Sequence, residues 1–583
     1  MKHLIGSLLL TGVVALGALA QITYPANMSA DTAHAPFLHG VASGDPLGDA
    51  VMLWTRVTPD SAGSDVDVAV QLATDTAFAD VRFDTIVTAD SASDWTVRVD
   101  ATGLSPGTDY AYRFIDPIGR SSRTGHTRTT PTGPTERVRI AVASCSSIYG
   151  GFFNAYARIA ERDLDAVVHL GDYIYEFVDN NGGFRIPDPY PLSIGDNASV
   201  QDWRDRHAYY LFDPDLRAAR AAHPWIMMWD NHDARTTDNG RQAFLEWNPI
   251  RAPRTTHDTI FRRFAFGDLV RLHVMDIRSF QRIDTLADGS PSLITNDQRD
   301  WLLDGLAASP AHWNVVTSQE MFGDFSIGSF GPIVGIDDSV FDRGGWEGVD
   351  AERDTILHTI DRLGVSNPFF IAGDAHISMV MDLHPDPFDS TAYDGLTGAG
   401  SFATEFLPTS ISRVNLDEMG LGDFAPAVEN VAMTSNPHHV FSEFTEHGYG
   451  WIEFTPDQAL ARIWWSDILQ ITEDESLGFE GRVRSGDKHW DRVFSGVRQL
   501  DWGTDRFIVS PNPTTGRAVI RSTHAIRACD VTVTDALGRL VRADTRCSDP
   551  TTVTVDLHGL APGLYDVVIR TDRGVRRVAV VKE

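Results

Sequence analysis

The sequence predicts a protein of the α/β class, in which a layered α/β domain stands between two smaller all-β modules. Strand-like runs separated by Gly, Pro, Asp and Ser fill residues 37–130. From Val138 onwards such runs alternate with segments of helical spacing, which is the pattern of an α/β domain. After about Trp502 short strand-like runs return without helical segments between them. At 583 residues the chain is long enough for several domains with separate cores.

The N-terminus has the features of a secretory signal peptide over residues 1–20. A short basic segment precedes an apolar run from Leu4 to Ala20, whose last three residues have the small-x-small pattern of a cleavage site. The alternative is a buried N-terminal helix or an anchor. No later stretch reaches the roughly 18 consecutive apolar residues of a spanning helix. We therefore expect an exported chain that starts near Gln21 and has no transmembrane span.

The charge balance excludes some partners. The chain carries 80 acidic and 49 basic side chains, a net charge of −31. A field of this sign repels nucleic acids and anionic membranes, so neither is expected as a specific partner. Three cysteines are too few for a disulfide framework in a chain of this length.

The first module, residues 21–133, is expected to be a small β-sandwich of the immunoglobulin or fibronectin type III kind, because the turn at residues 103–108 is followed by an alternating strand. Its expected strands are Val51–Arg56, Val66–Leu72, Trp95–Val99 and Tyr110–Ile115.

The α/β domain is expected over residues 134–501 and the last module over 502–583. The expected strands of the α/β domain are Val138–Ala143, Ala166–Leu170, Trp225–Trp229, Leu269–Met275, Trp313–Ser318 and Pro368–Ala372. Its expected helices are Asn154–Arg162, Arg251–Phe266 and Asp297–Ala308.

Residues that can bind metals follow four of the expected strands. They are Cys145, then Asp172 and Tyr175, then Asp230, Asn231 and His232, and finally Asp374 and His376. In such sheets the functional residues collect beyond the carboxyl ends of the strands. Each cluster alone is a weak signal, because a lone His or Asp at a strand end is more often structural. Four clusters in this order predict a dinuclear metal site, with two cations about 3.5–4 Å apart.

The donor types separate the two metals. Cys145, Tyr175 and His376 would share one metal with a bridging Asp172, and thiolate with phenolate suits a ferric ion. Asp172, Asn231 and Asp374 would bind the other, where oxygen donors suit Ca²⁺ or Mg²⁺. The alternative for Cys145 is a buried, inert thiol.

These motifs resemble those of the PhoD-like alkaline phosphatases of the metallophosphatase superfamily, over residues 37–498. The motifs that carry the resemblance are Phe37–Pro46, Val51–Arg56, Ala143–Ser146, Gly171–Glu176, Trp229–Asp233, Met275–Arg278, Gly373–His376, Thr404–Phe406, Ser410–Ser412, Asn436–His438 and His447–Tyr449. The resemblance implies a four-layer α/β metallophosphatase sandwich. It implies Fe³⁺ bound by Cys145, Asp172, Tyr175 and His376. It also implies Ca²⁺ bound by Asp172, Asn231 and Asp374, with Mg²⁺, Mn²⁺ or Zn²⁺ possible at this second site.

The sequence departs from the family pattern at one ligand motif. Family members often have Asp-Asp-His-Glu where this chain has Asp230-Asn231-His232-Asp233. The Asn form matches the wider superfamily, so Asn231 is kept as the ligand. Asp230 is expected to lie behind the ligands and to support them without contacting the metal.

The function that follows is a secreted, metal-dependent phosphoric ester hydrolase in which metal-activated hydroxide releases phosphate. His232 would donate a proton to the leaving oxygen. Arg278 would hold a phosphate oxygen, or alternatively form an ion pair with Asp276. The competing predictions are a phosphodiesterase or phospholipase D-like enzyme on the same site, and a non-catalytic cell-surface binding protein. We expect a monomer.

The last module resembles the C-terminal sorting domain of the type IX secretion system. The resemblance rests on Pro511–Pro513, Asp535–Arg539, Gly559–Tyr565 and the final Val578–Lys582. It implies recognition by the type IX machinery after export through the periplasm, and a secreted or cell-surface location. The alternative is a carbohydrate-binding or adhesive β-sandwich. Cys529 and Cys547 both lie here, and a disulfide between them would add about 3 kcal/mol of stability.

Overall fold

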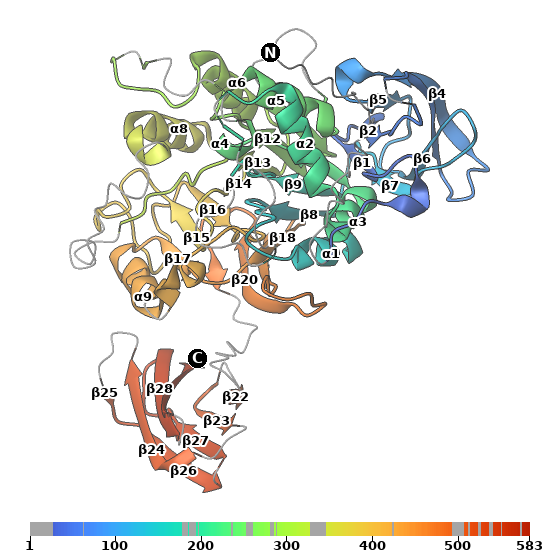
Figure 1. The fold of residues 1–583 in the computed structure, drawn as a ribbon. Coiled ribbons are helices and arrows are strands. Elements are labelled where there is room, and N and C mark those ends of the chain that lie inside the picture. The colour runs from blue at the N-terminus through green and yellow to red at the C-terminus, as the bar shows by residue number, and fades with distance from the viewer. Residues whose placement is uncertain are drawn as a thin grey trace, which may run out of the picture.

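The computed structural model describes most of the chain between residues 27 and 582 (Figure 1). Outside the described residues lie 1–26, 62, 178–184, 186–193, 196, 235–236, 252–259, 280–284, 287, 327–344, 423–424, 493–506, 511–513, 523–525, 536–539, 550, 572–573 and 583. The predicted signal peptide falls in the first of these ranges.

Two large sheets form the centre of the protein. The first has the strand order β21 (Asp491–Arg492), β20 (Ser476–Arg484), β19 (Gln458–Trp465), β18 (Gly448–Phe454), β8 (Val138–Ala143), β9 (Ala166–His169), β10 (Pro224–Met227), β1 (Val41–Gly44), β2 (Ala50–Arg56) and β5 (Thr96–Thr102). The second has the order β11 (Arg262–Phe266), β12 (Val270–Val274), β13 (Trp313–Thr317), β14 (Pro368–Ile371), β16 (Ala403–Leu407), β15 (Ser378–Leu383) and β17 (His439–Glu443).

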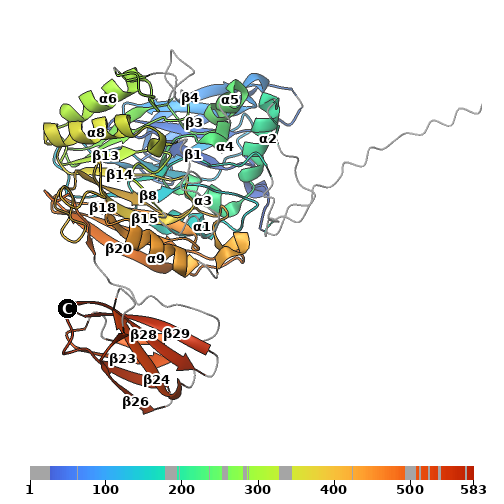
Figure 2. The same ribbon diagram turned by 90° about the vertical axis from the view of Figure 1, so that its left-hand side faces the viewer.

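Helices cover the outer faces of the two sheets (Figure 2). On the first sheet these are α1 (Asn154–Glu161), α2 (Val200–Tyr210), α3 (Pro214–Ala222), the short α4 (Asn231–Ala234) and α5 (Asp238–Trp247). On the second they are α6 (Asn296–Ala307), α8 (Asp350–Leu363) and α9 (Ala425–Ser435). Single helical turns lie at Thr32–His34, Ser91–Ser93, Trp346–Gly348 and Asp417–Leu421.

Two apolar cores hold these layers together. The larger core joins the facing sides of the sheets, where Val142 and Phe369 are buried, and extends under α1, α3 and α5. The smaller core lies between the second sheet and its helices, and includes Leu302 and Ile356. The layers therefore follow the order helix, sheet, sheet, helix, and the predicted α/β class is confirmed.

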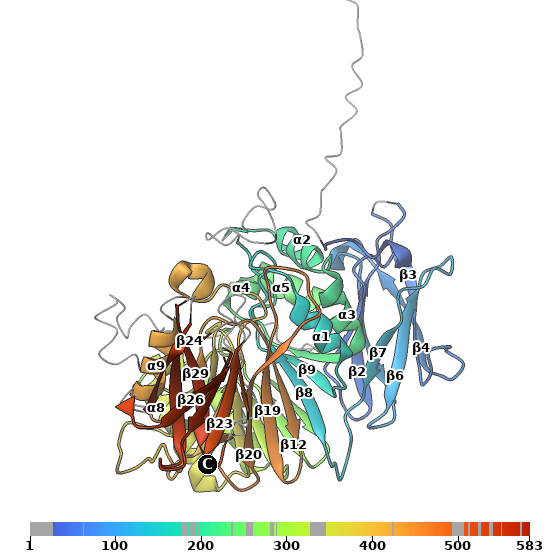
Figure 3. The same cartoon turned by 90° about the horizontal axis from the view of Figure 1, so that it is seen from below.

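The N-terminal β strands are divided between two sheets. Strands β4 (Val81–Ala89), β3 (Val66–Ala73), β6 (Asp109–Ile115) and β7 (Gly125–Arg128) form a sheet of their own. Strand β1 instead pairs in parallel with β10, with Ser43 opposite Pro224, so β1, β2 and β5 continue the central sheet. Figure 3 shows β2 of this extension on the same side of the molecule as β8 and β9. A Cβ on Gly44 would lie 2.5 Å from the carbonyl oxygen of Trp225, which explains a glycine at this close approach.

One predicted element is wrong. Residues 251–266 were expected to form a helix, but Arg262–Phe266 is strand β11, which pairs antiparallel with β12. Phe264 and Phe266 are buried on one side, and Gly267, at φ 59°, makes the turn into β12. The two-residue period of burial in Arg262–Phe266 therefore outweighs the apparent helical spacing. The preceding residues 252–259 lie outside the described residues.

The C-terminal module consists of two four-stranded sheets around a small core that contains Ile520, Val555 and Val567. One sheet has the order β22 (Phe507–Ser510), β23 (Arg517–Ser522), β27 (Thr552–Asp556) and β26 (Asp544–Asp549), and the other β25 (Leu540–Val541), β24 (Ile526–Asp535), β28 (Gly563–Thr571) and β29 (Gly574–Lys582).

The cysteines differ in state. Cys547 is disulfide-bonded, and Cys145 is free and buried. The side chain of Cys529 lies outside the described residues, so its pairing with Cys547 stays a prediction. Within the described residues, no helix has both the length and the apolar character that crossing a membrane requires.

Candidate metal centre

Four of the predicted ligands share an unusual backbone conformation at the ends of strands. Cys145 follows β8, Asp172 follows β9, and Asp374 and His376 follow β14. Their φ angles are 57°, 53°, 64° and 59°, in the left-handed region that residues other than glycine rarely occupy. Such strained backbone collects at functional sites, where the surrounding fold holds it in place.

Hydrogen bonds between neighbouring turns maintain this geometry. The backbone N–H of Cys145 donates to the carbonyl of Gly171 at 3.1 Å, and that of Ser146 donates to the carbonyl of Asp172 at 2.8 Å. The buried carboxylate of Asp233 accepts from the N–H of Ile174 and of Asp230, each at 2.9 Å. The turns after β8, β9 and β10 are thus fixed to one another.

The first group contains the residues predicted for iron. Ligand atoms of Cys145, Asp172 and His376 all lie within 4.8 Å of one another. The Tyr175 hydroxyl donates to Asp172 Oδ2 at 2.8 Å and lies 3.3 Å from His376 Nε2. The structure therefore brings together a thiol, a phenol, an imidazole and a carboxylate.

The second group contains two of the predicted oxygen ligands, Asp172 and Asp374, together with Asp230. Carboxylate oxygens of Asp172, Asp230 and Asp374 lie within 4.8 Å of one another, so Asp172 belongs to both groups. Asp230, which was expected to support the ligands from behind, has a carboxylate oxygen close to those of the other two. Asn231 is exposed at the start of α4, and its N–H donates to Asp230 Oδ1 at 2.7 Å. Its role as a ligand stays a prediction.

The electrostatics of the two groups fit bound cations. Burial and the charge of Asp230 raise the pKa of Asp172 to about 6, and burial and Asp374 raise that of Asp230 to about 6. Burial and Asp172 also raise the pKa of the Cys145 thiol, whereas burial lowers that of His376 to about 3. Asp230 Oδ2 is buried and has no hydrogen-bond partner among the described residues. Positive charge between these donors would relieve the repulsion and satisfy that oxygen.

His232 stands next to both groups. The backbone N–H of His232 donates to Asp172 Oδ1 at 3.2 Å, and the ring nitrogen Nδ1 lies 2.8 Å from Glu176 Oε2. Burial alone would lower the pKa of His232, but Asp172 and Glu176 raise it to about 9. These two carboxylates therefore favour the imidazolium form of the side chain. The sequence places Glu176 within a motif but does not indicate its contact with His232.

Arg278 is bound by carboxylates from three different turns. Its guanidinium pairs with Asp230 and Glu320 and lies 3.6 Å from Asp374 Oδ1. The alternative predicted for it, an ion pair with Asp276, does not form in the described structure, where the backbone N–H of Arg278 is the group that contacts Asp276. Glu320, which follows β13, is a site residue that the sequence does not predict.

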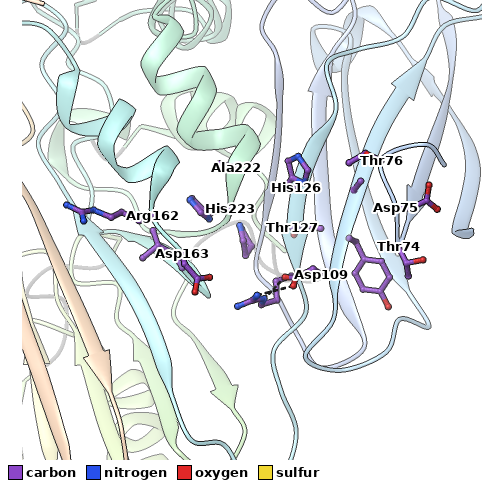
Figure 4. A pocket seen from close by; sticks show the side chains of 15 residues that line it. Thr74, Asp75, Thr76, Asp109, His126, Thr127, Arg162, Asp163, Ala222 and His223 are labelled. Carbon is purple, nitrogen blue, oxygen red and sulfur yellow. Dashed lines mark hydrogen bonds and ion pairs between the residues drawn. The ribbon is translucent and has the colours of Figure 1, made fainter. Parts of the chain in front are cut away.

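A cavity lies elsewhere in the described structure. It has a volume of about 240 Å³ and lies between the N-terminal sheet, at Thr74, Asp109 and His126, and the catalytic side, at Arg162 and His223 (Figure 4). None of the predicted ligands lines it.

The chain matches known families over three stretches. Residues 140–463 match the PhoD-like phosphatase family, residues 23–131 match the N-terminal domain of PhoD-like phosphatase, and residues 509–583 match the secretion system C-terminal sorting domain.

Individual proteins are similar to the chain over most of its length. It is 31% identical to alkaline phosphatase D from Bacillus subtilis (strain 168) over 469 residues, which cover 73% of this chain and 76% of that protein. A solved structure of PhoD superimposes with a TM-score of 0.68 at 28% identity, over 80% of this chain and 93% of that one.

Proposed function

Because this chain belongs to the PhoD-like phosphatase family and is a phosphoric ester hydrolase, we propose that it is an exported alkaline phosphatase with one iron and one calcium ion. The observation that carries this proposal is the sharing of Asp172 between two donor groups of different chemistry. A carboxylate common to both groups is what two neighbouring cations require. The soft donors of the first group suit iron, and the oxygen donors of the second suit calcium.

The residues of the chain have distinct tasks in hydrolysis. When bound, the two cations supply positive charge that polarises a phosphate ester and makes water a better nucleophile. His232, whose protonated form the neighbouring Glu176 favours, donates its proton to the leaving oxygen. Arg278 positions Asp230 and Asp374, since its guanidinium lies between their carboxylates.

The experiment that tests this proposal compares mono- and bis-nitrophenyl phosphate as substrates, with elemental analysis of the same samples. We expect faster turnover of the monoester, loss of activity with a chelator, and recovery when Ca²⁺ is added back. Faster turnover of the diester would instead support the phosphodiesterase. Full activity in a metal-free sample would contradict the metal centre, and no turnover in a fully loaded sample would support the binding protein.

Replacing Cys145 with serine should lower the iron content selectively, because the hydroxyl is a much weaker donor than a thiolate. We expect at least about tenfold weaker iron retention, with calcium less affected. Elemental analysis measures both metals. The matched control is the double variant Cys529→Ser/Cys547→Ser in the C-terminal module, which should keep its iron. Unchanged iron in Cys145→Ser would show that the thiolate is not a ligand.

We also propose that the C-terminal module directs the chain through the type IX secretion machinery to the cell surface or medium. The match of residues 509–583 to a secretion sorting domain supports this route. Deleting that stretch should retain an active enzyme inside the cell envelope.

A further inference from the structure

Gln319 lies at the end of a central strand of the second sheet, beside the candidate metal centre. Strand β13 has β12 on one side and β14 on the other, and all three run parallel. The segments that follow these strands therefore meet at one edge of the sheet, and they carry Arg278, Gln319 and Asp374. Gln319 is fully buried, so its polar atoms need partners within the protein.

The side-chain amide of Gln319 connects this edge to the first sheet. Its Oε1 accepts from the backbone N–H of Ile277 at 3.3 Å, and its Nε2 donates to the carbonyl of Trp229 at 3.0 Å. Ile277 follows β12 of the second sheet, whereas Trp229 follows β10 of the first. An N–H can only donate and a carbonyl can only accept, so these partners fix the orientation of the amide. The backbone carbonyl of Gln319 also accepts from the N–H of Gly373 at 3.0 Å.

The bond to Trp229 acts on Asp230 through one peptide group. The carbonyl of Trp229 and the N–H of Asp230 belong to the same planar unit. Gln319 Nε2 holds the carbonyl end of this unit, and Asp233 Oδ2 accepts from its N–H at 2.9 Å. The peptide is therefore held at both ends, and it leads directly to the Cα from which the Asp230 carboxylate projects.

The peptide that precedes Ile277 is held in the same way. Gln319 Oε1 accepts from its N–H, and its carbonyl accepts from Gln298 Nε2 at 2.8 Å. The next residue is Arg278, whose guanidinium pairs with the Asp230 carboxylate. One buried amide thus fixes both the segment that carries this carboxylate and the segment that carries its cationic partner.

The two donor groups depend on this amide to different degrees. Asp230 belongs only to the group of oxygen donors, with Asp172 and Asp374. Cys145, of the other group, follows β8, and the described hydrogen bonds of the Gln319 side chain do not involve that turn. Loss of the amide should therefore weaken the oxygen-ligated cation more than the iron.

We propose that Gln319 is a positioning residue, which holds Asp230 and Arg278 at the spacing that the oxygen-ligated cation requires. The inference deepens the proposed function and rests on it. Both polar atoms of the amide are bonded to the backbone, so Gln319 acts on the cation through Asp230 and does not contact it. Removal of a group that orients metal ligands commonly weakens metal binding by about 10- to 100-fold.

The test is the variant Gln319→Met, which keeps the length of the side chain but removes both of its hydrogen bonds. Titration calorimetry of calcium-depleted protein with Ca²⁺ should show a dissociation constant about 10- to 100-fold higher than in the parent, with unchanged iron content. Hydrolysis of nitrophenyl phosphate should fall at low Ca²⁺ and recover as Ca²⁺ saturates, a rescue that general damage to the fold would not show. Gln319→Asn, one methylene shorter, should show a smaller loss of affinity, and it supplies the same comparison if Gln319→Met does not fold.

Asn314→Leu is the matched control, because Asn314 lies at the opposite end of β13. This residue is also a buried amide, and its Nδ2 donates to the carbonyl of Ser366 at 2.7 Å. Both substitutions should lower the unfolding temperature in the presence of a chelator, since each removes a hydrogen bond between a buried amide and a backbone carbonyl. Only Gln319→Met should lower the affinity for calcium.

The outcomes separate this inference from the proposed function. Unchanged calcium affinity in Gln319→Met would overturn the inference. An equal loss of affinity in Asn314→Leu, or a parallel loss of iron and calcium in Gln319→Met, would also overturn it, because the amide would then support only the fold as a whole. If the parent hydrolyses no ester, the proposed function fails, while the calcium titration still decides the role of Gln319. A parent that binds no Ca²⁺ would overturn both.

Discussion

Replacing Asp172 with asparagine should lower kcat/KM for phosphate esters by about 1,000-fold or more and should empty both metal positions. A thousandfold loss corresponds to about 4 kcal/mol of transition-state stabilisation, within the several kcal/mol that bound cations supply. The effect is this large because Asp172 belongs to both donor groups, so one substitution removes an anionic ligand from each. The measurements are steady-state kinetics and elemental analysis of the same sample.

Asparagine is the informative substitution because its short polar side chain tolerates the left-handed backbone, at φ 53°, that Asp172 adopts. Backbone strain would therefore not confound the result.

In the presence of a chelator, the variant should unfold near the temperature of the parent. The substitution removes a buried carboxylate whose charged form is disfavoured by burial and by the charge of Asp230, so the metal-free fold loses little stability. Addition of metal should raise the unfolding temperature of the parent alone. Asp205→Asn, on the exposed side of α2, is the control. Near-normal activity in Asp172→Asn would contradict the shared ligand.

Deleting residues 27–131 should abolish folding of the remaining chain, because these residues supply three strands of the central sheet. Without β1, the backbone edge of β10 would be exposed, and an unpaired edge promotes aggregation. The deletion would also remove the fully buried Trp54, whose ring centroid lies 5.8 Å from that of Trp247, so Trp247 would lose this ring contact. We expect no soluble protein on expression, whereas deletion of the C-terminal module should leave a soluble one.

A single substitution tests the same interface without removing any strand. Asp45 is buried and accepts hydrogen bonds from Arg262, at 2.7 Å from Nη2, and from the N–H of Arg251, also at 2.7 Å. Asp45→Asn leaves the Arg262 charge without its partner, so we expect a loss of about 3–5 kcal/mol in the free energy of unfolding. Denaturant titration measures it, with the exposed Asp49→Asn as control. Equal stability of the two variants would show that the contacts of Asp45 do not stabilise this interface.

The sequence predicts the positions of most strands because local burial patterns set them. Strand β8 has the predicted bounds, and β9 differs from its prediction at one end by a single residue. The convergence of Cys145, Asp172 and Tyr175 follows from the same information, since the ends of parallel strands meet at one edge of a sheet. His376 follows β14 of the second sheet, so its place beside them depends on how the two sheets pack and not on strand order within one sheet.

Long-range contacts account for what the sequence does not predict. Successive side chains at the start of a helix diverge by about 100°, so whether Asp230 or Asn231 faces the other carboxylates depends on how the chain leaves β10. Arg278 finds its partners on turns that are distant in sequence, whereas sequence inspection favours the neighbouring Asp276. The pairing of β1 with β10 joins residues 181 positions apart, Ser43 and Pro224, and no local pattern encodes it.

The left-handed backbone of the four ligand residues also limits how this sequence can change over evolutionary time. At Cys145, Asp172, Asp374 and His376, β-branched residues are excluded by conformation before their chemistry matters. A lineage that loses the metals should therefore accumulate Gly or Asn at these positions more readily than Val, Ile or Thr. Descendants without activity would remain recognisable from this restricted choice of residues, because the turns would persist after the chemistry was lost.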